Sequence, residues 1–243
     1  MEDPLFASLG AFPRLVCGLS ARQHGTMTAA ADPARKAQVI QNFQRYFASI
    51  DLAAANAVRC KQAHGATVAA VAAAQRGTAV RDTDGLVTAT PQTFLAVTVG
   101  DCLPLYFYDP KRQAVGLAHA GWRSLQQGIP AATVRQLQDQ YGTSPSDVLV
   151  GIGPGIGPCH FLVGPDVAER FAAFPAAFTR RADGTLALDL KAVAALQLHA
   201  CGVRREHIET SSDCTACLSE RYFSYRRDRP AVVEAMVAVI GLR

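Results

Sequence analysis

The sequence predicts a single domain that contains both α-helices and β-strands. Its 243 residues include no stretch with the composition of a linker, which favours one domain over two. Short β-rich apolar runs alternate with segments whose apolar residues recur at helical spacing. Apolar residues make up 49% of the chain and charged residues 18%, which excludes a disordered or fibrous protein. We therefore expect one α/β domain over residues 1–243 with a substantial buried core.

The charge and the cysteines narrow the class of protein further. The net charge of +4 is mild, and no basic stripe is interleaved with stacking aromatics, so nucleic-acid binding is not predicted. The first residues are acidic, unlike a secretory signal, and no run of about 18–20 apolar residues could span a membrane. Seven cysteines without regular spacing favour reduced thiols over a disulfide framework. We expect a cytoplasmic protein with no membrane partner and a small, anionic ligand.

The first predicted elements enclose a polar loop. Leu15 to Ser20 is predicted to be a short strand, and the loop after it carries Arg22 and His24. A solvated surface arginine is the simplest interpretation of Arg22 from its local sequence alone. The segment from Asp32 to about Ser49 is predicted to be a helix, because proline stands at its first position and apolar residues follow at helical spacing.

Residues 58–68 are predicted to form a strand that Gly65 interrupts. Alternation along this strand places Cys60, Gln62 and His64 on one face. A lone histidine is more often a half-buried, hydrogen-bonded side chain than a ligand. A functional role for His64 therefore depends on a second cysteine–histidine pair that could meet it.

The segment from Phe94 to Arg123 supplies such a pair in a predicted β-hairpin. Two apolar runs flank Asp109-Pro110-Lys111-Arg112, where proline favours a turn. A turn symmetric about the Pro110–Lys111 bond places Cys102 directly opposite His119. Opposed Cβ atoms lie about 4.5–5.5 Å apart, from where a thiolate and an imidazole can reach one ion.

Polar residues occur on both sides of this hairpin. Asp82 and Asp84 precede it beside glycine, where capping a turn is favoured over an acid–base role. Gly121 to about Gly128 is predicted to be a helix, and Arg123 in its first turn would attract an anion. Trp122, the only tryptophan, fits a core anchor and a substrate contact equally well.

The C-terminal half is predicted to surround a rigid loop with helices and strands. Four glycines and two prolines in residues 151–158 predict a structured pocket wall, and the prolines exclude a dinucleotide-binding loop. Helices are predicted over Pro130–Tyr141, Pro165–Phe174 and Leu190–Ala200, and strands over Val148–Val150 and Arg221–Asp228. Residues 231–242 fit either a strand or a helix.

Four further ligand-type residues carry weak signals. Cys159 and His160 are adjacent, and neighbours on a strand point to opposite faces, so no catalytic pair is predicted there. Cys214 and Cys217 form a single C-x-x-C without a second pair at zinc-finger distance, and coincidence is the favoured interpretation. The sequence assigns no role to these four residues.

A series of short motifs along the chain resembles one known family. The motifs are S-x-R at residues 20–22, QAHG at 62–65, DGLVT at 84–88, VGDCLPLYF at 99–107, HAGWR at 119–123, GPGIGPC at 153–159 and FSYRRD at 223–228. On these motifs the chain is identified as a member of the laccase-domain family, also called the multicopper polyphenol oxidoreductase family. Members of this family have been described as purine nucleoside phosphorylases and as peptidoglycan editing factors. The resemblance extends from about Leu15 to the C-terminus.

The resemblance implies both a metal site and a fold. The family binds a zinc ion through residues that correspond to His64, Cys102 and His119, which makes Cys102 and His119 catalytic candidates. This ligand set agrees with the hairpin prediction. The implied fold is a single α/β domain with mixed β-sheets layered between helices, similar to the toxin-type cysteine hydrolase fold.

The resemblance also suggests contacts to the substrate. Arg22 is implied as a catalytic phosphate or substrate contact, and Gln62 and Arg123 are further candidates for substrate binding. Two places depart from the family pattern. Residues 229–231 replace a Thr-Gly-Arg element, and His160 replaces a second cysteine, so no family role is carried over to these positions.

The implied function is that of a zinc-dependent purine nucleoside enzyme, monomeric or homodimeric. It would use phosphate to cleave adenosine, inosine and methylthioadenosine, and it would deaminate adenosine. Copper is disfavoured, because a multicopper oxidase needs roughly ten His and Cys ligands and the chain has six histidines. Two alternatives stay open: a hydrolase that edits peptidoglycan precursors with Cys102 as nucleophile and His119 as base, and a non-enzymatic, zinc-stabilised binding protein.

Overall fold

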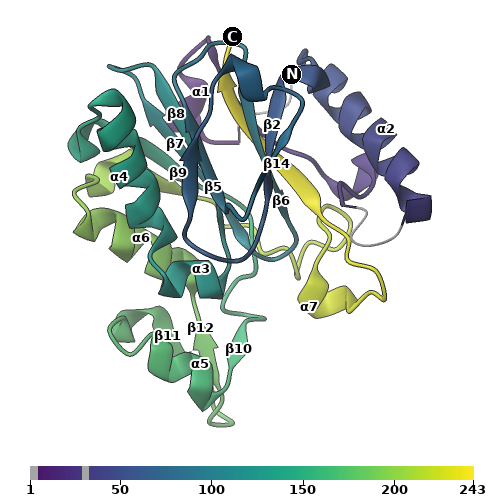
Figure 1. Ribbon diagram of the computed structural model, residues 1–243. Coiled ribbons are helices and arrows are strands. Elements are labelled where there is room, and N and C mark those ends of the chain that lie inside the picture. The colour runs from purple at the N-terminus through teal and green to yellow at the C-terminus, as the bar shows by residue number, and fades with distance from the viewer. Residues whose placement is uncertain (1–4, 29–32) are drawn as a thin grey trace.

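Two β-sheets packed face to face between helices form the body of the molecule (Figure 1). The computed structural model describes residues 5–28 and 33–243. The first sheet has the strand order β1 (Leu15–Leu19), β14 (Met236–Leu242), β6 (Phe94–Val99), β2 (Ala57–Lys61) and β4 (Ala79–Arg81). The second has the order β13 (Ile208–Thr210), β9 (Leu149–Ile152), β7 (Leu103–Asp109), β8 (Ala114–Ala120), β5 (Gly85–Thr88) and β3 (Val68–Ala70).

Helices cover the outer face of each sheet. On the first sheet, Phe47 of α2 (Pro33–Ser49) packs against Phe94 and Val239. On the second, α3 (Trp122–Gln126), α4 (Ile129–Tyr141) and α6 (Leu190–Ala200) bury residues such as Leu137. The inner faces meet in a separate apolar core, where Ile240 and Leu117 belong to the same cluster. This arrangement confirms the expected α/β fold with mixed sheets layered between helices.

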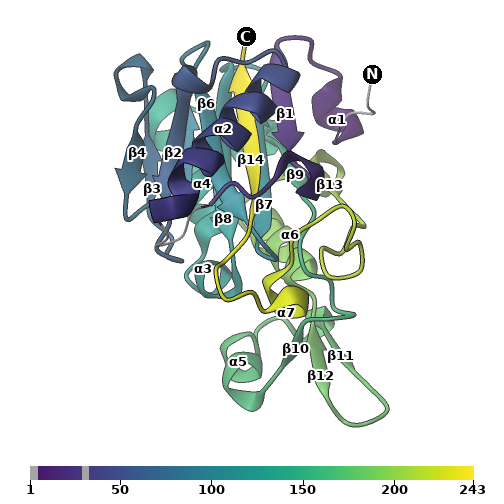
Figure 2. The same ribbon diagram turned by 90° about the vertical axis from the view of Figure 1, so that its right-hand side faces the viewer.

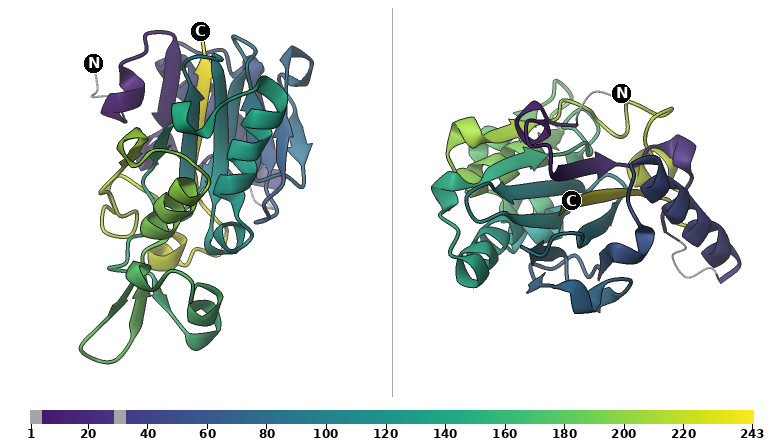
Figure 3. Two further views of the ribbon diagram at one scale, coloured as in Figure 1. Left: turned by 90° about the vertical axis from the view of Figure 1, so that its left-hand side faces the viewer. Right: turned by 90° about the horizontal axis from the view of Figure 1, so that it is seen from above.

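A small arm extends from one end of this body (Figures 2 and 3). It consists of β10 (Leu162–Val163), β12 (Leu186–Leu188) and β11 (Phe178–Arg180), together with α5 (Pro165–Arg170). Two short helices, α1 (Ala7–Gly10) and α7 (Tyr225–Asp228), complete the α-helices of the described residues. Within residues 5–28 and 33–243, every helix is too short or too polar to span a bilayer.

The hairpin β7–β8 lies at the centre of the second sheet. All residues of both strands are buried, because α4 and α6 cover one face of the sheet and the first sheet covers the other. This double coverage explains why both strands are continuous apolar runs rather than alternating ones. The hairpin is therefore a rigid support for residues at its open end.

Two strand predictions are wrong. Residues 58–68 do not form one strand: β2 ends at Lys61, His64 turns with φ at +58°, and β3 continues in the other sheet. The segment Arg221–Asp228 ends in the helix α7, because the Ser224 side chain accepts a hydrogen bond from the Arg227 N–H and caps it. The open choice for residues 231–242 is resolved as the strand β14.

The helix predictions fare better. The end of α2 at Ser49 and both ends of α6 are confirmed, although Asp32 lies outside the described residues. The prediction is too long for α3, which ends at Gln126, and for α5, which ends at Arg170.

Candidate metal centre

The hairpin brings Cys102 and His119 together, but not in the predicted register. His119 pairs with Pro104, and Cys102 lies just before β7. The predicted register is wrong because the turn has four residues: Asp109 Oδ1 accepts hydrogen bonds from the N–H groups of Lys111 and Arg112, at 2.8 and 3.1 Å, and β8 starts only at Ala114. The error is two residues, and an even shift leaves the side chains on the same face of the strand.

His64 joins this pair from the turn after β2. The ligand atoms of His64, Cys102 and His119 all lie within 4.8 Å of one another. The two imidazole rings meet edge to face, with centroids 4.8 Å apart. His119 is buried, Cys102 is half-buried and His64 is exposed, so the cluster faces outward on one side. The structure thus brings together the three residues that the sequence predicted as metal ligands.

Asp84 contacts two residues of this cluster, His64 and His119. Its carboxylate is fully buried and lies 2.9 Å from His119 Nδ1. It also accepts hydrogen bonds from the N–H groups of Ala63, His64 and Gly65, at 2.8 to 3.0 Å. Asp84 therefore caps a turn, but the turn is at residues 63–65 and not its own beside Gly85, and the sequence analysis missed both this turn and the contact to His119. With Nδ1 engaged, Nε2 is the His119 atom that remains for a metal ion, as in other carboxylate–histidine–metal pairs.

The surroundings of Cys102 and His119 favour the charged forms of both side chains, a thiolate and an imidazolium. Burial alone would raise the pKa of Cys102, but His119 and His64 lower it to about 6. Burial would lower the pKa of His119, but Cys102 and Asp84 raise it to about 9. The pKa of Asp84 is lowered by His119 and the three N–H groups, against the effect of burial. The lowered pKa of Cys102 favours the thiolate, the form that binds metals and attacks electrophiles.

The cluster opens into a cleft of about 800 Å³. Gln62 and Arg123 line this cleft, as do the aromatic side chains of Trp122, Phe161 and Tyr225. The Arg123 guanidinium lies 4.2 Å above the Trp122 ring and is exposed. The cleft therefore combines a Cys/His cluster, a cation and apolar ring faces.

Gln62 and Arg22, the other two candidates for substrate contact, already have partners within the protein. The Gln62 amide is already paired, since it donates to the Thr98 carbonyl at 2.8 Å and accepts from the Thr98 N–H at 3.0 Å. Arg22 does not line the cleft. It forms a 2.7 Å ion pair with Asp228 at the end of α7, whose Tyr225 does line the cleft.

The structure brings together four other residues whose sequence signals were weak. Cys159 and His160 lie in a turn and not on a strand, so their side chains can face the same way. Cys214 and Cys217 lie against them, so the C-x-x-C is not an isolated coincidence. The sequence signal for this second cluster was weak because 54 residues separate His160 from Cys214.

Comparisons with known proteins agree on the family. The family model described as multi-copper polyphenol oxidoreductase laccase matches residues 16–243. A purine nucleoside phosphorylase YlmD of Geobacillus stearothermophilus is 40% identical over 198 residues, covering 76% of this chain and 72% of that protein. The crystal structure of YlmD from the same organism superposes with a TM-score of 0.89 at 36% identity, over 96% of this chain and 93% of that one. A Bacillus licheniformis hypothetical protein YfiH gives a TM-score of 0.85 at 32% identity, over 94% and 93% of the two chains.

Proposed function

The chain belongs to the multi-copper polyphenol oxidoreductase laccase family, and from that premise we propose that it is a metal-dependent purine nucleoside phosphorylase. The observation that carries this proposal is the cluster of His64, Cys102 and His119 at the floor of a cleft with Arg123 on its wall. A relative that is 40% identical bears the name of this activity.

We assign His64, Cys102 and His119 as ligands of a zinc ion. Two imidazoles and a thiolate suit zinc, and three protein ligands leave a fourth position for water or substrate. A zinc ion bound there would polarise a substrate oxygen or lower the pKa of a bound water to about 7. The three residues do not suit a multicopper oxidase, because such a centre needs roughly ten ligands.

The remaining cleft residues suit a purine nucleoside and phosphate. The rings of Trp122, Phe161 and Tyr225 offer flat apolar faces to a purine base. The Arg123 guanidinium can hold phosphate by charge-assisted hydrogen bonds. In phosphorolysis, a phosphate oxygen forms a bond to the anomeric carbon of the ribose, the glycosidic C–N bond breaks, and the purine leaves with a proton. Arg22 would act on phosphate from outside the cleft lining, through its link to α7.

Deamination of adenosine is a second candidate activity of the same cleft. An open position beside three ligands permits activation of a water molecule for attack on C6 of adenine. Cys102 as a nucleophile, with His119 as its acid–base partner, is the competing assignment for a peptidoglycan precursor. The thiolate state of Cys102 serves both assignments, so only products distinguish them.

Product analysis tests the proposal directly. We expect adenosine and inosine to yield free adenine and hypoxanthine only when phosphate is present. Inosine formed from adenosine without phosphate would establish deamination. If zinc-loaded protein forms neither product, the purine assignment is wrong. A Cys201→Ser variant should form the same products as the unmodified protein, because Cys201 is a half-buried cysteine outside the cluster and the cleft lining.

A further inference from the structure

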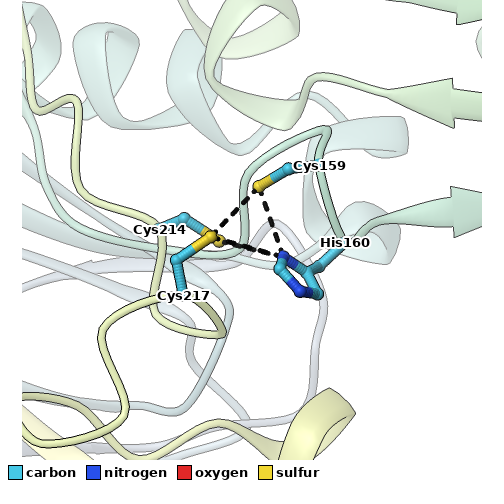
Figure 4. Close-up of side chains that lie close together, drawn as sticks. All are labelled: Cys159, His160, Cys214 and Cys217. Carbon is cyan, nitrogen blue, oxygen red and sulfur yellow. Dashed lines mark hydrogen bonds between the residues drawn. The ribbon is translucent and has the colours of Figure 1, made fainter.

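A second group of metal-ligand side chains lies outside the cleft lining (Figure 4). Cys159 Sγ is 3.5 Å from Cys217 Sγ and 3.3 Å from His160 Nδ1. His160 Nδ1 is 3.4 Å from Cys217 Sγ and 3.9 Å from Cys214 Sγ. Figure 4 shows the sulfur atoms and the imidazole nitrogen turned toward one another. The four donor atoms all lie within 4.8 Å of one another.

These separations match a single tetrahedral ion. Zinc binds thiolate sulfur at about 2.3 Å and imidazole nitrogen at about 2.0–2.1 Å, so tetrahedral ligands lie roughly 3.8 Å apart for two sulfurs and roughly 3.5 Å for sulfur and nitrogen. The observed 3.3 to 3.9 Å lies around these values. A disulfide would need its sulfurs at about 2.05 Å, well below the 3.5 Å between Cys159 and Cys217.

The backbone around the cluster is arranged to support thiolates. The Gly157 N–H donates to Cys214 Sγ at 3.2 Å. A Cβ on Gly157 would lie 3.2 Å from Cys159 Sγ, so glycine allows the loop to pass this close to the sulfur. The N–H groups of Cys217 and Leu218 both donate to the Cys214 carbonyl, which folds the C-x-x-C into a tight turn.

Two basic side chains, Lys191 and Arg227, hold the backbone of the C-x-x-C turn, and Arg227 is also ion-paired with Asp228. Three thiolates, one neutral imidazole and a divalent ion have a net charge of −1. Arg227 donates to the carbonyls of Thr215 and Ala216, the two residues between the cysteines, at 2.8 and 3.3 Å. Lys191 donates to the carbonyl of Asp213, directly before Cys214. The C-x-x-C turn therefore lies beside two positive groups.

We propose that Cys159, His160, Cys214 and Cys217 bind a second zinc ion in a closed, structural site. All four positions of a tetrahedral ion are filled by the protein, so this ion has no place for a substrate. It would tie the glycine-rich loop to the C-x-x-C turn, which are linked otherwise by the bridge between Gly155 and Cys214.

The position of this site relates it to the cleft. The glycine-rich loop carries Ile156 and leads to Phe161, and both residues line the cleft. Thr215, inside the C-x-x-C, donates a 2.6 Å hydrogen bond to Asp101, the neighbour of Cys102. The second ion would therefore fix one wall of the cleft without contacting the substrate.

Zinc content of the full-length chain tests the proposal independently of any activity. We expect Cys217→Ser to lose one zinc per chain relative to the unmodified protein, measured by elemental analysis and native mass spectrometry. Cys201→Ser, which removes a cysteine outside both clusters, should lose none. Because Cys217→Ser could fail to fold, the second measurement uses His64→Ala loaded with cobalt. This variant keeps all four ligands of the second cluster and should show the absorption of tetrahedral cobalt bound to several thiolates.

Two results would overturn the second site. One is equal zinc content in folded Cys217→Ser and the unmodified protein, together with no tetrahedral cobalt–thiolate spectrum in His64→Ala. The other is a disulfide between Cys159 and Cys217 in freshly isolated protein, seen as the loss of two hydrogens in the intact mass. Failure of purine cleavage would leave these metal counts unchanged, so the two proposals can fail separately.

Discussion

The two Cys/His clusters of this chain differ in ligand number, burial and surroundings. The first has three candidate ligands, is hydrogen-bonded to the buried carboxylate of Asp84 and faces a cleft of about 800 Å³. The second has four ligands, three of them exposed, and is held by backbone N–H and carbonyl groups of two loops. Three ligands leave a position for chemistry and four do not. On this difference rest our two proposals, catalysis at the first cluster and a structural role for the second.

Removing one ligand from each cluster should give the largest contrast. We expect His119→Ala to lower purine cleavage by about 10³-fold or more, because a metal-dependent step loses its ion. Cys217→Ser should lower turnover far less, but should reduce the melting temperature by roughly 5–10 °C, as expected when an ion that binds only the folded state is lost. Steady-state rates and thermal unfolding of both variants measure this. Equal turnover rates for the two variants would contradict the proposal that only the first cluster is catalytic.

The Asp84→Asn variant should show how much of the zinc affinity depends on the carboxylate that orients His119. The change keeps the size of the side chain but removes the charge that faces His119 Nδ1. We expect zinc affinity at the first cluster to fall about 10–100-fold, with a parallel loss of activity at limiting zinc. Competition with a chelator of known affinity measures this, and Asp82→Asn, an exposed neighbour, is the control. Unchanged affinity would leave Asp84 with a turn-capping role alone.

Removal of Arg123 or Arg22 should weaken phosphate binding without changing the zinc content. We expect Arg123→Ala to raise the KM for phosphate about tenfold, the loss of one charge-assisted hydrogen bond. Arg22→Ala should have a smaller effect in the same direction, because Arg22 is paired with Asp228 and does not line the cleft. Arg135→Ala, on the exposed side of α4, should change neither the KM nor the zinc content. Zinc loss in Arg22→Ala or Arg123→Ala would contradict both assignments.

The sequence predicted the first cluster and missed the second for physical reasons. Cys102 and His119 are joined by a short hairpin, where an error of two residues in the register preserves the face and hence the contact. The second cluster depends on a contact between distant loops, and no periodic pattern encodes the packing of two loops. The wrong strand over residues 58–68 has a related cause. Its alternation is real up to Lys61, but the turn at His64 is set by Asp84, from another part of the chain.

Each cluster also packs a glycine against a cysteine sulfur, and the smallest expected contrast lies there. A Cβ on Gly121 would approach Cys102 Sγ to 2.8 Å, whereas one on Gly157 would lie 3.2 Å from Cys159 Sγ. The first distance forces the half-buried Cys102 side chain to move. The second asks only for a shift of a few tenths of an ångström by the exposed Cys159 side chain. We expect Gly121→Ala to weaken zinc binding at the first cluster about tenfold, or about 1.4 kcal/mol, which lies within the roughly 1–3 kcal/mol that overpacking costs.

Gly157→Ala should weaken binding at the second cluster less, by roughly threefold, since overpacking costs least where the surroundings can relax. Zinc competition on the two single variants gives both values from one experiment. A larger loss at Gly157 than at Gly121 would mean that the two loops of the second cluster are the more rigid support. In that case the second cluster would be organised before the metal binds, and the buried hairpin would not be the stiffer of the two frameworks.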